Sequence, residues 1–225
     1  MVKLKTSVKK FIMIAVFGIA MAYLEAVVVV YLRMLFYPEG ILFPIKIMPL
    51  STALIEIGRE FSTIIMLLVI GYLSGKTLIE RFLYFIFCFG VWDIFYYVWL
   101  KIFLNWPTSL LENDLLFLIP IPWIAPVLAP IIVSLTMIIA SVLSLFFQNK
   151  GHTLKVEKKY LLLAILGSII IVISFFWNAY TVNLLEESNP GFQWEIFFIG
   201  EVILIIGLIL FLKKNKPKTM KFFIK

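Results

Sequence analysis

The sequence predicts an all-α fold: a polytopic transmembrane bundle of six helices with both termini in the cytoplasm. Three observations predict it. Of the 225 residues, 63% are hydrophobic and 15% are charged, and the apolar residues gather in six long runs. Soluble domains are about half apolar and about a quarter charged, whereas a helix that crosses a bilayer needs about 20 consecutive apolar residues. We therefore expect a single integral membrane domain over residues 1–225.

The six predicted spans are each about as long as a bilayer is thick. They are expected at residues 11–32, 51–74, 81–104, 124–147, 160–182 and 193–212. Pro49 precedes Ser51, which is suited to cap the second span. A basic N-terminus over 1–10 and a basic tail over 213–225 flank the bundle, which occupies 11–212.

The basic residues predict the orientation of the chain. Most of the 20 Lys and Arg residues fall in the N-terminus, the second and fourth loops and the tail; the exceptions are Arg33, Lys46, Arg59 and Lys101. Cytoplasmic segments carry an excess of Lys and Arg, so both termini are predicted to be cytoplasmic. The basic cytoplasmic segments account for the net charge of +7, and anionic lipid would attract them. We expect a multi-pass protein of the plasma (cell) membrane.

The segment 105–130 differs from the other connections because of its prolines. A short surface helix is expected after Trp106 and Pro107. Its water-facing side would carry Glu112, Asn113 and Asp114, and its lipid-facing side Leu110, Leu111, Leu115 and Leu118. Four prolines that cannot donate backbone hydrogen bonds then follow: Pro120, Pro122, Pro126 and Pro130. We favour a proline-stiffened start of the fourth span over a segment that packs on protein or lines a wet cavity.

Ionisable side chains inside the spans are the main functional signal. Near the bilayer centre each costs at least about 2.5–3.5 kcal/mol, and such groups normally face the bundle interior or a cavity. The predicted ligand- or proton-binding residues are Glu25, Glu56, Arg59, Glu60, Asp93, Tyr97, Lys101 and Glu201. Helical spacing puts Gly18, Ala22 and Glu25 on one face, so Glu25 should point into the bundle. Glu56 and Arg59 are three residues apart and should pair directly.

The predicted depths place Asp93 near the bilayer midplane and the other intramembrane acids between it and the outer surface. These five carboxylates face one intramembrane arginine, Arg59. A buried excess of negative charge is not sustained, so either some acids are protonated or a cation completes an outward-facing polar pocket. The alternative is a structural network, in which Arg59 pairs with its neighbours on the second span and Asp93 contacts Lys101 or Arg33.

A single histidine (His152) and a single cysteine (Cys88) exclude a zinc cluster, a disulfide framework and a Ser-His-Asp triad, and no cofactor is expected. Three function classes stay open. The first is a small proton- or cation-coupled transporter or cation-binding protein. The second is a membrane-embedded enzyme acting on a lipid-like substrate at the outer leaflet, with paired carboxylates as acid and base. The third is a non-catalytic membrane component of a larger complex.

The expected partners follow from these classes. They are membrane lipid, a cation or small polar ligand, and a further membrane protein. Nucleic acid is not expected, because the basic tail is short and no second domain accompanies it.

Overall fold

The computed structural model describes residues 2–37, 49–149, 154–184 and 191–215. Within these ranges the chain is mostly helical, with six helices and one two-stranded sheet. In chain order the elements are α1 (Val2–Phe36), α2 (Leu50–Ser74), α3 (Leu78–Leu104), β1 (Asn113–Phe117), β2 (Trp123–Pro126), α4 (Leu128–Asn149), α5 (Lys158–Leu184) and α6 (Trp194–Lys214). Most of the basic tail predicted for 213–225 lies outside the described residues.

Five of these helices are long and apolar enough to cross a membrane: α1, α3, α4, α5 and α6. Helix α2 has 25 residues, but Glu56, Arg59 and Glu60 interrupt its apolar sequence. Many large apolar side chains are exposed on the outer faces of the helices. A surface of this kind is stable in contact with lipid rather than water. The helices therefore indicate a multi-pass membrane protein.

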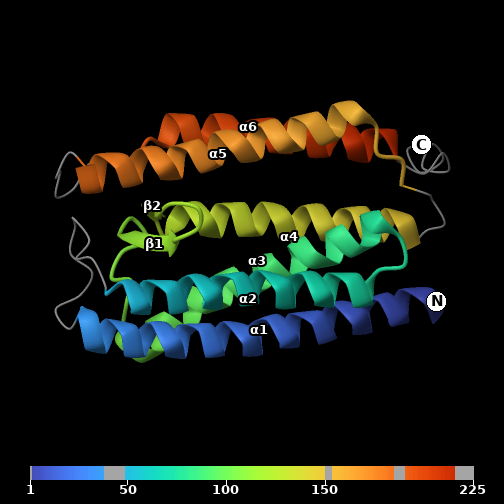
Figure 1. The fold of residues 1–225 in the computed structure, drawn as a ribbon. Coiled ribbons are helices and arrows are strands. Elements are labelled where there is room, and N and C mark those ends of the chain that lie inside the picture. The colour runs from blue at the N-terminus through green and yellow to red at the C-terminus, as the bar shows by residue number, and fades with distance from the viewer. Residues whose placement is uncertain (1, 38–48, 150–153, 185–190, 216–225) are drawn as a thin grey trace.

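The helices form two groups that run side by side (Figure 1). In the larger group, α3 packs against α1, α2 and α4. In the smaller group, α5 and α6 pack along each other and reach the rest of the bundle mainly through α4 and β2. Helix α1 begins and α6 ends at the same end of the bundle, and the β-sheet lies toward the opposite end (Figure 1).

Small residues let the helices approach closely. Ala22 of α1 is fully buried, and a Cβ atom added to Gly18 would lie 3.3 Å from a backbone oxygen of α3. A Cβ atom on Gly90 of α3 would lie 2.7 Å from the backbone oxygen of Ser134 on α4. Close contacts through small residues are typical of membrane bundles. The predicted inward face of the first span is confirmed.

Residues 113–126 form an antiparallel hairpin, so the predicted surface helix in this segment is wrong. Helix α4 begins at Leu128, four residues after the predicted start of the fourth span at residue 124. Asp114 was expected to face water, but it is buried, with 1% of its surface exposed. A helical period puts Asp114 on the polar side of the segment, whereas in the hairpin it turns inward toward Arg33 of α1.

The prolines explain why this segment forms strands. Pro120 and Pro122 lie in the connection between β1 and β2, and Pro126 is the last residue of β2. A proline in a helix interior removes a backbone hydrogen bond and clashes with the preceding turn, whereas strand ends and loops tolerate it. Pro130 falls in the first turn of α4, where the backbone N–H has no helical partner in any case.

Candidate functional site

The first cluster of charged residues joins α1 to α2. Arg59 Nε donates a hydrogen bond to Glu56 Oε2 at 2.8 Å, and the same guanidinium pairs with Glu25 of α1. Thr63 Oγ1 donates to the second oxygen of Glu25 at 3.0 Å. The predicted Glu56–Arg59 pair is confirmed, and one guanidinium serves two carboxylates from different helices.

Glu60 contacts the hairpin instead of a cation. Its two carboxylate oxygens accept a hydrogen bond from the backbone N–H of Leu118, the residue after β1, at 2.9 and 3.0 Å. Glu60 is 5% exposed and makes no salt bridge with any residue that the structure describes. This hydrogen bond therefore links α2 to the hairpin.

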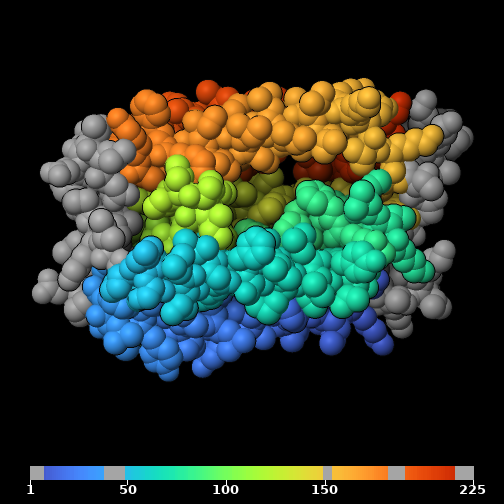
Figure 2. All heavy atoms as spheres, in the orientation of Figure 1, coloured from blue at the N-terminus to red at the C-terminus, as the bar shows by residue number. Residues whose placement is uncertain are grey.

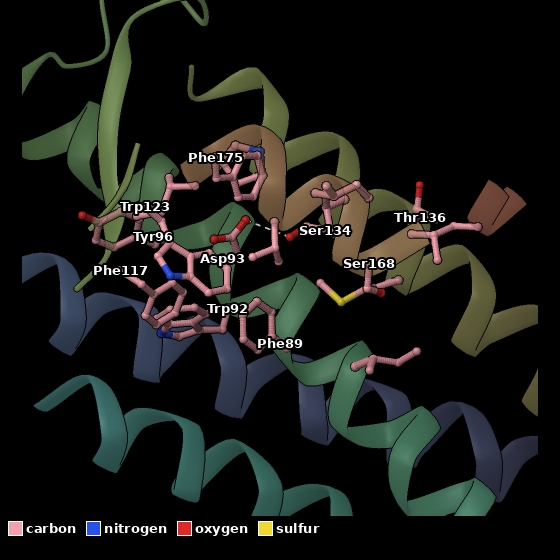
Figure 3. A pocket seen from close by; sticks show the side chains of 18 of the residues that line it. Phe89, Trp92, Asp93, Tyr96, Phe117, Trp123, Ser134, Thr136, Ser168 and Phe175 are labelled. Atoms are coloured by element: carbon pink, nitrogen blue, oxygen red, sulfur yellow. Dashed lines mark hydrogen bonds between the residues drawn. The ribbon is translucent and has the colours of Figure 1, made fainter. Parts of the chain in front are cut away.

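Asp93 lies in the middle of α3 and faces α4. It accepts a hydrogen bond from Ser134 Oγ at 2.8 Å, drawn as a dashed line in Figure 3. Aromatic side chains gather beside this carboxyl group (Figure 3): Trp92, Tyr96, Phe117 and Trp123. Two of these rings come from α3 and two from the hairpin, so the hairpin completes the surroundings of Asp93.

Arg33 is paired with Asp114 of β1 rather than with Asp93. Its Nη2 atom lies 3.2 Å from Asp114 Oδ1, and its guanidinium carbon lies 3.8 Å from the centroid of the Trp106 ring. Tyr97 lies next to Asp114. Burial raises the pKa of Asp114 above its ordinary value, although the Arg33 guanidinium opposes this shift. The alternative Asp93–Arg33 contact is therefore wrong.

Sequence reasoning missed Asp114 as a site residue. The signal that could have found it is an acidic residue directly before the apolar run of β1, followed by prolines that break a helix. Read as a strand, this run alternates between two faces and allows Asp114 to point inward.

Two of the predicted site residues lie apart from the others. Lys101 Nζ donates to the backbone oxygens of Asn105 and Pro107, at 3.2 and 2.8 Å, at the C-terminal end of α3. The alternative Asp93–Lys101 contact is therefore wrong. Glu201 of α6 accepts a hydrogen bond from Thr136 Oγ1 of α4 at 3.0 Å, and its Oε1 atom has no hydrogen-bond partner among the described residues.

A cavity of about 870 Å³ lies beside these charges. It is lined by six of the predicted site residues: Glu25, Glu56, Arg59, Glu60, Asp93 and Tyr97. Arg33 and Asp114 line it too, and apolar side chains continue it to Leu78, Tyr160 and Phe211 at the other end of the bundle. Figure 2 shows the surface hollowed between α5 and the start of α3.

Carboxylates outnumber cations in this part of the bundle. The six acids are Glu25, Glu56, Glu60, Asp93, Asp114 and Glu201. Arg59 pairs with two of them and Arg33 with a third, while the other three make no salt bridge within the described ranges. Ionised groups removed from water without a partner are costly. Protons or a bound cation would remove that cost.

Comparison with known proteins finds no matching family model, no matching curated protein and no matching solved structure. In the part of the chain that the structure describes, no group of three or more His, Cys, Asp or Glu side chains is arranged to hold a metal ion. Function is therefore inferred from the residues of the site itself.

Proposed function

We propose that the protein is a small transporter coupled to protons or cations, with six membrane-spanning helices and both termini in the cytoplasm. The excess of Lys and Arg in the N-terminus, the second and fourth loops and the tail supports this orientation. The hairpin then lies on the outer side. Helix α2 completes the six spans. Its Arg59 pairs with Glu25 of α1 and with Glu56, and its Glu60 contacts the hairpin.

The observation that carries the proposal is that the carboxylates open into a cavity that runs along the bundle. The cavity is lined by Glu60 and Asp93 toward its outer end and by Tyr160 and Phe211 toward its inner end. A transporter needs ionisable groups at membrane depth together with a path that leads away from them. A purely structural network needs neither surplus carboxylates nor a cavity of about 870 Å³.

Glu60 offers a way to couple ion binding to movement. As a carboxylate it accepts a charge-assisted hydrogen bond from Leu118 N–H, and such bonds are roughly twice as strong as neutral ones. A proton or cation that neutralises Glu60 weakens its hold on the hairpin. The hairpin residues Phe117 and Trp123 line the cavity, so their release would open its outer end. Binding would in this way favour one of two conformations.

The opening between α5 and the start of α3 favours a second candidate function. A site that opens sideways between helices suits an enzyme acting on a lipid-like substrate, with Glu60 and Asp93 as acid and base. Such an enzyme would consume its substrate, whereas a transporter returns it unchanged, so product analysis after incubation with membrane lipid separates the two functions.

The binding step is tested by unfolding the purified protein across a range of pH and in Na⁺, K⁺, Mg²⁺ or Ca²⁺. A ligand bound only by the folded state at about 100 times its dissociation constant adds roughly 2.7 kcal/mol of stability. We expect one cation or one pH step to stabilise the wild type. The response should disappear in Glu60→Gln, which keeps the shape of the side chain and removes its charge.

Lys101→Gln is the matched control, because Lys101 is a charged residue of the same bundle end that contacts backbone oxygens away from the cavity. Its response to pH and cations should equal that of the wild type. Equal responses in the wild type and Glu60→Gln would contradict the proposal and leave a structural role for the carboxylate.

A further inference from the structure

Asp93 is a buried carboxylate held by one neutral donor. It is 8% exposed, and Ser134 Oγ is its hydrogen-bond partner. The arginines that line the same cavity are engaged elsewhere, Arg33 with Asp114 and Arg59 with two glutamates. No Lys or Arg in the described ranges forms a salt bridge with Asp93. The negative charge at this position has no countercharge from the described protein.

Four aromatic rings form a box beside Asp93 (Figure 3): Trp92, Tyr96, Phe117 and Trp123. Trp92 and Tyr96 are stacked with ring centroids 6.4 Å apart, and Phe117 lies 6.4 Å from Trp92 and 5.7 Å from Trp123. Aromatic faces attract cations, and cages of such rings recognise quaternary ammonium groups. In the described part of the chain, no Lys or Arg lies over any of these four rings.

The indole N–H of Trp92 is a second, independent sign of a ligand. Trp92 is 4% exposed and lines the cavity, and its Nε1 atom has no hydrogen-bond partner among the described residues. Nε1 of Trp123 is also buried without such a partner among the described residues. A buried donor left without an acceptor costs stability, so native proteins rarely leave one. An oxygen atom on a ligand would satisfy it.

The rest of the cavity suits an apolar body. Beyond Asp93 the lining is mostly aliphatic and aromatic, with Ile171, Leu204 and Phe211 among its members. A volume of about 870 Å³ lies within the range of about 300–1,000 Å³ that is usual for small-molecule sites. The hollow between α5 and the start of α3 lies on the side of the bundle, where lipid would surround it (Figure 2). A ligand dissolved in the membrane can reach it there.

We propose that Asp93 and the aromatic box bind the head group of an amphipathic organic cation whose apolar part fills the cavity and which enters from the membrane between α3 and α5. The head group carries an acceptor oxygen close to its positive charge. This inference rests on the proposed function, since it names the class of substrate that the transporter moves. Asp93 supplies the countercharge, the rings hold the cation, and Trp92 donates to the oxygen.

The test measures binding of tritiated decyldimethylhydroxyethylammonium to the full-length protein in phosphatidylglycerol nanodiscs, whose lipid carries no ammonium group, with empty nanodiscs to subtract partitioning into lipid. We expect saturable binding that decanol, which has the same chain without the charge, does not displace. Removing one partner of a buried charge pair is costly, so Asp93→Asn should weaken binding at least about tenfold. Glu195→Gln is the control: this acid in the first turn of α6 does not line the cavity, and the variant should bind like the wild type.

Phe117→Leu provides a second variant, which removes one ring of the box and leaves Asp93 in place. It should weaken binding several-fold. Equal affinity of the wild type, Asp93→Asn and Phe117→Leu would overturn the inference, and so would displacement by decanol. Loss of binding in Asp93→Asn, with no pH or cation response in wild-type unfolding, would keep this site and overturn the proposed coupling instead.

Discussion

The contact between Arg33 and Asp114 gives the sharpest test of the hairpin's place in the bundle. Arg33→Met keeps an unbranched apolar stem and removes the guanidinium, which leaves the buried Asp114 without its cation. Asp114→Asn keeps the size of the side chain and leaves Arg33 unpaired. Either change breaks the link between α1 and β1 from one side.

The expected magnitude follows from burial. The side chains of Arg33 and Asp114 are 9% and 2% exposed, so little water can replace the lost partner. Removing one member of a buried ion pair costs about 3–5 kcal/mol. Arg33→Met also loses the contact with the Trp106 ring, a further contribution of about 0.5–2 kcal/mol. In the double variant no unpaired charge is left, so its cost should fall short of the sum of the single costs by at least about 1.5 kcal/mol.

The assay is equilibrium unfolding in mixed detergent micelles, followed by circular dichroism. Glu157→Gln is the matched control, because Glu157 pairs with Lys159 at 2.9 Å but its side chain is 37% exposed. Exposed ion pairs contribute little to stability, so this change should be small. Two results would show that Asp114 is not buried against Arg33. One is a double variant whose loss of stability equals the sum of the two single losses. The other is a loss in Arg33→Met no larger than the loss in Glu157→Gln.

Two further predictions concern helix contacts and pH. Gly90→Ala and Gly200→Ala should destabilise the bundle by about 1–3 kcal/mol in the same assay, because the new Cβ atoms would lie 2.7 and 2.8 Å from backbone oxygens. Gly58→Ala is the control and should not destabilise the bundle, because no atom lies within 4 Å of its new Cβ atom. The destabilisation caused by Arg33→Met should grow as pH rises. Burial raises the pKa of Asp114 and the guanidinium opposes this shift, so in the variant the folded-state pKa lies further above the unfolded value. The variant therefore loses more stability than the wild type as pH rises through the folded-state pKa. A pH series of unfolding curves checks this, and a cost that is constant with pH would contradict it.

The helices could be predicted from the sequence because lipid imposes a strict local rule. A segment that crosses the bilayer must satisfy its own backbone and present apolar side chains along its whole length. Helical spacing alone also predicted the Glu56–Arg59 pair and the inward direction of Glu25, since both depend on positions within a single helix. These parts of the site required no knowledge of how the helices are arranged.

The hairpin could not be predicted in the same way, because what fixes it lies far away in the sequence. Asp114 is buried by Arg33, which is 81 residues earlier, and Leu118 is held by Glu60, which is 58 residues earlier. Within 105–130 alone, the acids and leucines fit an amphipathic helix as well as a strand. The sequence predicts Lys101 near the site, but its side chain reaches the backbone oxygens of Asn105 and Pro107, just beyond the C-terminal end of α3. Lys side chains near a helix C-terminus commonly bind backbone oxygens there.

The hairpin also changes how the charges of the site are understood. In the alternative drawn from the sequence, Arg33 pairs with Asp93 and reduces the surplus of carboxylates within the helices. With the hairpin in place, Arg33 is committed to Asp114, and Glu60 is committed to a backbone donor. The hairpin therefore leaves Asp93 without a countercharge and, through Phe117 and Trp123, places aromatic rings beside it. One element thus supplies both features that the proposed cation site requires. A change at Phe117 therefore tests that proposal as directly as a change at Asp93.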